Sequence, residues 1–107
     1  MQTLRRLGAR QIVWVTIREP RAEFLPPAGR AELGRYAWYF PYVNERLRVL
    51  DARYDDVALA DWTAVSNRRG LTYDSIHLTI RGARLMGRTI KAAINAEAER
   101  QARKTSP

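Results

Sequence analysis

A six-residue apolar run near the N-terminus constrains the fold of this chain more than any other feature. Residues 12–17 read Ile-Val-Trp-Val-Thr-Ile, with β-branched and aromatic side chains and no alternation of apolar and polar residues. A strand with one solvent-facing side alternates, whereas a strand covered on both faces does not. The run therefore predicts a buried strand over 12–17 in a parallel sheet with flanking helices, and an α/β fold class.

The next segments complete a strand–helix–strand unit. Pro41 is expected to open a packing helix over 41–54, in which apolar residues recur at helical spacing. The short run Val-Ala-Leu-Ala then predicts a second strand over 57–61. A chain of 107 residues has room for one core, so residues 1–107 are expected to form a single domain.

Two loops and a long helix account for the remaining chain. Prolines and glycines punctuate residues 18–40 and predict a loop with at most a short helical turn. The aromatic cluster at 36–40 is expected to cap the core, and the alternative is that it lines a binding cleft. A polar segment predicts a second loop over 63–78, and the last helix is expected over 79–103 with Thr79 as its N-cap.

Composition narrows the classes of function. The chain has no cysteine and one histidine, which excludes disulfides and thiolate metal sites, so neither a metal nor a cofactor is expected. Its net charge of +8 could attract nucleic acid, but the basic residues are scattered, and a solvated surface is the favoured interpretation. No membrane span and no signal-peptide pattern is present. The chain as written is expected to be cytoplasmic, or exported if a preceding part carries a signal.

The histidine follows an aspartate by three residues, as Asp74 and His77, in the second predicted loop. In open α/β sheets, ligands bind beyond the carboxyl ends of the strands, from which this loop departs. A histidine accepts the proton of a nucleophile when a carboxylate fixes its tautomer and stabilises the imidazolium. Asp74 and His77 are therefore a candidate catalytic pair, and the alternative is a surface or helix-capping histidine.

The pair belongs to a longer block, Asp-Ser-Ile-His-Leu-Thr at 74–79 followed by Gly82. This block resembles the last conserved block of the SGNH (GDSL-like) esterases and acyl hydrolases, commonly Asp-Gly-x-His-Leu-Thr-x-x-Gly. The resemblance covers most of residues 4–95. Three further segments are similar to family elements in order and spacing: 13–19, 42–47 and 58–62.

The resemblance implies roles for the pair and a fold for the chain. His77 would be the general base and Asp74 the carboxylate that orients it, with Ser75 in place of the family's frequent glycine. The implied fold is a partial three-layer α/β/α, flavodoxin-like SGNH fold with a short parallel sheet, two core strands and flanking helices. The implied substrates are esters or other acylated compounds.

The family's nucleophile has no counterpart here. It is a serine in a Gly-Asp-Ser motif, which this chain lacks, and Ser66, Ser75 and Ser106 are its only serines. Asn44 lies on the packing helix and does not match the family's oxyanion asparagine. Because a base without its nucleophile has nothing to activate, we expect a hydrolase homologue that is inactive alone and corresponds to the C-terminal half of the domain.

Two alternatives remain at this stage: a non-catalytic interaction remnant and a small basic nucleic-acid-binding α/β protein. Two parallel strands make a poor sheet, and the strand at 12–17 would leave one edge unpaired. We therefore expect the chain to self-associate through that edge, and the alternative is that it is only marginally folded.

Overall fold

The computed structural model describes residues 1–74 and 77–105. Its sheet has two parallel strands, β1 (Ile12–Val15) and β2 (Val57–Ala60), and within the described residues no third strand joins them. Ile12 lies opposite Val57, and the register continues to the last pair, Val15 and Ala60. The α/β class and the parallel pairing expected from the sequence are confirmed.

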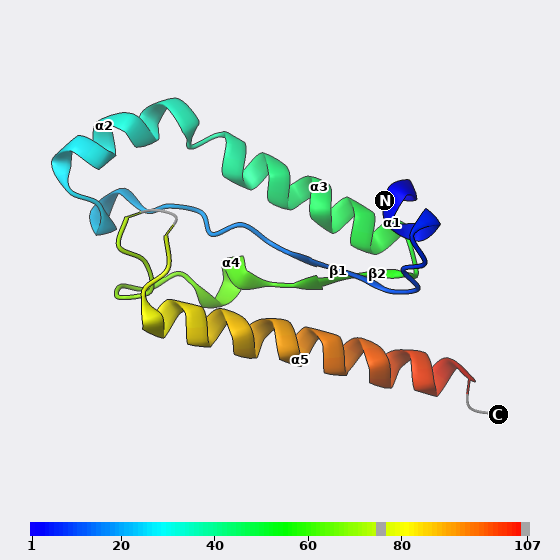
Figure 1. Cartoon of the computed structure of the whole chain (residues 1–107). Helices are drawn as coiled ribbons and strands as arrows, with labels where there is room; N and C mark the ends of the chain where they lie inside the picture. The colour runs from blue at the N-terminus through cyan, green and yellow to red at the C-terminus, as the bar shows by residue number, and fades with distance from the viewer. Residues whose placement is uncertain (75–76, 106–107) are drawn as a thin grey trace.

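Helices cover the two faces of this sheet. α3 (Tyr39–Arg53) lies on one side of the strands and α5 (Ile80–Thr105) on the other, and both pack against β2 (Figure 1). A short helix, α1 (Gln2–Arg6), precedes β1, and the single turn α4 (Trp62–Val65) follows β2. Cover on both faces explains why the strand sequences do not alternate.

The loop predicted over 18–40 is wrong in its second half. After a short 3₁₀ turn at Ala22–Phe24, the chain forms the ten-residue helix α2 (Pro27–Tyr36). Pro27 occupies the first helical position, where the missing N–H needs no partner, so the proline starts a helix here. Each glycine inside α2 costs about 1 kcal/mol relative to alanine, which weakens a helix without ending it.

Other bounds differ by smaller amounts. β1 ends at Val15, two residues before the predicted end at 17, because Ile17 pairs with the Asn44 side chain and not with β2. α3 begins at Tyr39, two residues before Pro41, because the N–H groups of the first helical turn have no acceptor within the helix. Asp61 lies outside β2 and accepts a hydrogen bond from the Ala64 N–H at 3.3 Å, so it caps α4. α4 thus occupies the start of the loop predicted over 63–78. α5 ends two residues beyond the predicted 103.

The chain is elongated and its core is small. The solvent-accessible surface is 7589 Å², whereas a compact monomer of 12.3 kDa exposes about 6,100 Å². The radius of gyration is 16.1 Å, against about 13 Å for a compact domain of this length. Much apolar surface that a compact domain would cover is therefore exposed. Among the described residues, the buried hydrophobic side chains of the core are those of Ile12, Leu25, Val57, Ala60, Trp62 and Leu71.

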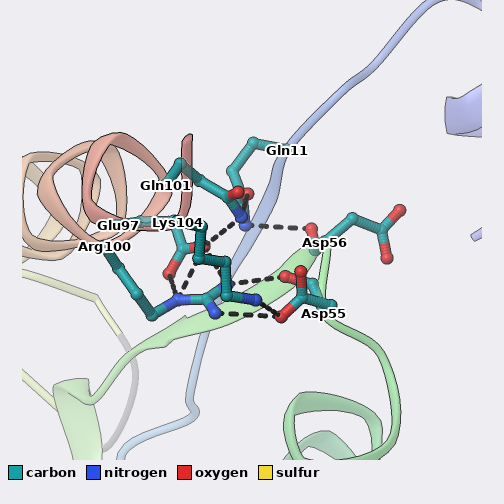
Figure 2. Close-up of polar contacts among 7 residues, drawn as sticks. All are labelled: Gln11, Asp55, Asp56, Glu97, Arg100, Gln101 and Lys104. Atoms are coloured by element: carbon teal, nitrogen blue, oxygen red, sulfur yellow. Dashed lines mark hydrogen bonds and ion pairs between the residues drawn. The ribbon is translucent and has the colours of Figure 1, made fainter. Parts of the chain in front are cut away.

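A polar network joins the last turns of α5 to the residues that precede β2 (Figure 2). Arg100 contacts the carboxylate of Glu97 and donates to that of Asp55 at 2.9 Å, and Lys104 also contacts Asp55. Glu97 is buried, and its hydrogen bond with Arg100 lowers the pKa of its carboxyl group. At the start of the strands, Arg5 forms a bidentate pair with Asp56 at 2.7 Å. These contacts lie at the amino ends of the strands, away from the loop that carries Asp74 and His77.

Candidate active site

The hydroxyl groups of Thr16 and Thr63 form hydrogen bonds between the segments that follow the carboxyl ends of β1 and β2. The Thr16 hydroxyl accepts from the Thr63 N–H at 2.9 Å and donates to the Asp61 carboxylate at 3.1 Å. The Thr63 hydroxyl donates to the Ile17 carbonyl at 2.7 Å. These bonds fix the segments that leave β1 and β2 relative to one another, which is the frame on which the site is built.

Asn44 adds a link from α3 to the same frame. Its amide Oδ1 accepts from the Ile17 N–H and its Nδ2 donates to the Ile17 carbonyl, both at 2.7 Å. The side chain is fully buried. Asn44 thus satisfies backbone groups just beyond the end of β1, where the sheet ladder no longer does so. Sequence reasoning placed it on a packing helix and missed this role, although a polar residue beside the apolar Val43 and Leu47 was a signal for it.

Arg18, a second residue that the sequence did not single out, anchors the loop after β2. Its buried guanidinium donates to the carbonyls of Ser66 at 2.9 Å and Arg68 at 3.0 Å, and to the Thr72 hydroxyl. Within the described chain it forms no ion pair, and burial lowers its pKa. The ring of Phe24 lies beneath it, 5.8 Å from the guanidinium carbon. The position of Arg18, directly after the apolar run at 12–17, was the signal in the sequence for this role.

A narrow loop carries the predicted pair. Its two sides meet in an antiparallel bridge between Thr72 and Leu78, and the Tyr73 N–H donates to the His77 carbonyl at 2.9 Å. Because Arg18 contacts Thr72, the loop is attached at its base to the segment that follows β1.

The far side of the loop is fixed by the start of α5. The Thr79 hydroxyl accepts from the Gly82 N–H at 3.1 Å and donates to the Gly70 carbonyl at 2.7 Å, so Thr79 is the N-cap as predicted. A Cβ atom on Gly82 would lie 1.9 Å from the Leu71 carbonyl oxygen, so only glycine permits this approach of helix and loop. The spacing of Thr79 and Gly82 therefore has a structural cause.

Asp74 and His77 are in direct contact. One carboxylate oxygen of Asp74 accepts from the His77 backbone N–H at 2.7 Å, and the other lies 2.7 Å from His77 Nδ1. With a proton on Nδ1, the lone pair on Nε2 is left to accept a proton from another group. Both side chains are exposed, at 77% for His77 and 54% for Asp74. The pair has the geometry of an oriented base at a surface that another molecule can reach.

An open apolar groove of about 690 Å³ adjoins this pair. Asp74 and Tyr73 line one side of it, and Leu33, Tyr36 and Tyr39 from α2 and α3 line the other. Tyr36 and Tyr39 are about half exposed, at 55% and 47%. The expectation that the 36–40 cluster caps the core is therefore wrong, and Tyr36, Tyr39 and Phe40 line a groove, as the alternative had it.

The other residues considered from the sequence do not supply a nucleophile. Ser66 is fully buried and its hydroxyl has no hydrogen-bond partner among the described residues, while Ser75 and Ser106 lie outside them. Asn44 is fully occupied by its contacts with Ile17 and Thr63. The described chain has no group of three or more His, Cys, Asp or Glu side chains able to hold a metal ion. Among the same residues, no helix combines the length and apolar character needed to cross a bilayer.

Comparison with known proteins adds no relative. No protein-family model matches the chain, and neither a curated protein nor a solved structure is significantly similar to it.

Proposed function

We propose that the chain is a homologue of the SGNH (GDSL-like) ester and acyl hydrolases that carries the base of the catalytic site without its nucleophile. His77 is the general base and Asp74 the carboxylate that orients it. The contact of Asp74 with both the backbone N–H and the Nδ1 atom of His77 carries this proposal. A histidine held in this way can take a proton from a serine hydroxyl, and the aspartate stabilises the imidazolium that forms.

The surroundings of the pair support the same proposal. The block from Asp74 to Gly82 that resembles the family is held by Arg18, Thr79 and the close approach of Gly82 to Leu71. The apolar groove beside Asp74 offers a place for the acyl or alcohol part of an ester. A serine and an oxyanion hole would have to come from another polypeptide segment, so the described chain alone is expected to hydrolyse esters no faster than free imidazole does.

The proposal is tested by supplying the missing half. The full chain is co-expressed with the N-terminal part of an SGNH esterase that contains the Gly-Asp-Ser strand and the oxyanion glycine and asparagine, and hydrolysis of p-nitrophenyl acetate is measured. We expect activity that neither part has alone. His77→Ala should abolish it, and Asp74→Asn should lower it by about 10⁴-fold because the imidazole then takes the wrong tautomer.

Asp51→Asn provides the matched control, because it removes an exposed carboxylate on α3 at the other end of the molecule. It should leave the activity of the assembled pair unchanged. A stable complex without activity, or activity that survives His77→Ala, would contradict the proposed role.

A second candidate function, an interaction module that pairs through a strand, is favoured by the open edge of β1. The Ile12 N–H donates at 2.8 Å to the carbonyl of Asp56, directly before β2, and the Thr16 N–H donates at 3.0 Å to that of Ala60 in β2. In a parallel ladder alternate residues bond to the same neighbour, so the amides of Val13 and Val15 face away from β2. Such an edge can accept a strand from a second copy or from another polypeptide.

Sedimentation velocity over a range of concentrations tests this candidate. We expect the mean sedimentation coefficient to rise with concentration. Hydrogen exchange at Val13 and Val15 should slow over the same range, while Trp14, whose amide faces β2, should stay protected throughout. A monomer at every concentration, with unchanged exchange at Val13 and Val15, would count against self-association through β1.

A further inference from the structure

The groove beside Asp74 is lined by acidic side chains, although the protein as a whole is basic. The chain carries a net charge of +8, yet none of the described residues that line the groove is an arginine, a lysine or a histidine. Two of them, Glu32 on α2 and Asp74, are carboxylates. Glu32 is exposed and forms no ion pair within the described part of the chain. The groove is thus a local anionic site on a strongly basic molecule.

Aromatic rings make up much of the remaining wall. Tyr36, Tyr39, Phe40 and Tyr73 all line the groove, together with aliphatic residues of α2 and the segment before it. The rings of Tyr39 and Phe40 lie 5.9 Å apart at an angle of 78°, so they form a corner and not a flat stack. Aromatic faces attract cations through the ring quadrupole, and quaternary ammonium groups are bound in this way without hydrogen bonds.

From this lining we infer that the groove binds an organic cation, specifically a quaternary or fully alkylated ammonium group attached to a short apolar body. The rings would contact the alkyl groups of the cation, and Glu32 and Asp74 would supply the opposite charge. An anionic ligand would be repelled by the same two carboxylates. The volume of about 690 Å³ lies in the range of small-molecule sites and exceeds what a single ammonium group requires, which leaves room for the attached body.

The position of Asp74 connects the groove to the proposed chemistry. Asp74 both lines the groove and contacts His77, so a cation in the groove would sit beside the proposed base. Together with the proposed function, on which this step rests, the groove identifies esters of quaternary amino alcohols as the substrate class. Binding of the cation itself does not depend on hydrolysis and is tested separately.

Binding is measured with the full, isotopically labelled chain by NMR titration at low ionic strength. The three probes have nearly the same shape and differ in charge: choline, its neutral carbon isostere 3,3-dimethylbutan-1-ol, and the anion 3,3-dimethylbutanoate. We expect choline to bind at least about fivefold more tightly than the neutral isostere. The amide shifts should be confined to residues 25–40 and 73–74, and the anion should not bind.

Variants of residues that line the groove test whether choline binds there. Glu32→Gln should weaken choline binding and leave binding of the neutral alcohol unchanged, whereas Tyr36→Leu should weaken choline binding by removing one ring. Both residues are exposed, so neither change removes core packing. Glu99→Gln removes an exposed carboxylate on α5, outside the groove, and should have no effect.

The results separate this inference from the proposed function. Equal affinity for choline and its neutral isostere, preference for the anion, absence of choline binding, or choline binding that is unchanged by both Glu32→Gln and Tyr36→Leu would overturn the cation site. If choline binds as expected but the assembled pair hydrolyses no ester, the cation site stands and the hydrolase proposal fails. If the assembled pair is active but hydrolyses acetylcholine no faster than the acetate of 3,3-dimethylbutan-1-ol, the substrate class is wrong.

Discussion

The Asn44 amide pairs with both backbone polar groups of Ile17, accepting from its N–H and donating to its carbonyl at 2.7 Å each. In this way a side chain of α3 supplies hydrogen bonds to the segment after β1, at a residue that no longer pairs with β2. The Asn44 side chain is fully buried and Ile17 is half-buried, so water replaces these bonds only at a cost when they are lost.

Replacing Asn44 with alanine should therefore destabilise the fold strongly. Asn44→Ala leaves the Ile17 N–H without its partner and removes one of the two donors to the Ile17 carbonyl, which keeps the Thr63 hydroxyl, so we expect the free energy of unfolding to fall by about 1–3 kcal/mol. Urea denaturation followed by circular dichroism measures this. The same change at the exposed Asn95 on α5 should cost less than about 0.5 kcal/mol, and similar losses at the two positions would contradict the assigned role of Asn44.

Two glycines of α5 should respond to alanine with opposite signs. Gly82→Ala places a methyl group 1.9 Å from the Leu71 carbonyl oxygen, so loop and helix must separate, at a cost of about 1–3 kcal/mol or more. Gly87 has no atom within 4 Å of the corresponding position, and Gly87→Ala should raise stability by about 0.5–1 kcal/mol through helix propensity. Thermal unfolding of both variants is the measurement, and a stabilised Gly82→Ala protein would show that the loop does not lie against this turn.

Arg18 should control the order of the loop that carries Asp74 and His77. Arg18→Met removes three charge-assisted hydrogen bonds, to Ser66, Arg68 and Thr72, so we expect the free energy of unfolding to fall by about 1.5–3 kcal/mol. Hydrogen exchange should accelerate most in residues 66–79. Arg69→Met, which removes an exposed side chain that donates only to the Glu23 carbonyl, is the control. Uniform acceleration across the whole chain would indicate general destabilisation and not a local anchor.

Acid should weaken the attachment of α5 to the residues before β2. The pKa values of Glu97 and Asp55 are lowered, mainly by hydrogen bonds with Arg100 and with Lys104 respectively. A carboxyl group whose pKa is lower in the folded state stabilises the fold above its unfolded pKa, and this stability is lost as the pH falls through the folded value. The free energy of unfolding should therefore begin to fall below about pH 4.5, the ordinary pKa of glutamate.

Glu97→Gln tests the origin of that pH dependence. The variant should be less stable at neutral pH and should lose less stability on acidification, because one of the groups that take up a proton is gone. Glu99→Gln, an exposed neighbour on the same helix, should keep the wild-type pH profile. Identical slopes for wild type and Glu97→Gln between pH 5 and 3 would exclude Glu97 as a source of the effect.

The sequence by itself determined the parts that depend on local pattern. The unbroken apolar run at 12–17 indicated a strand in a parallel sheet, and Thr79 followed by an amphipathic stretch indicated where α5 begins. The separation of three residues brought Asp74 within reach of His77, since a turn of the chain is enough to join them. These features involve neighbours along the chain, for which spacing and residue type carry the information.

Only the tertiary structure decided the rest, because the deciding contacts join residues far apart in sequence. The sequence places Asn44 on a packing helix but does not show its contact with Ile17, which spans 27 residues. Arg18 reaches Thr72 across 54 residues, and no local pattern encodes such a contact. The prolines and glycines of 18–40 favour a loop, but Pro27 begins α2, and Tyr36 of this helix lines the same groove as Asp74. Packing at a distance thus placed the pair beside a groove, and that groove gives it a candidate ligand.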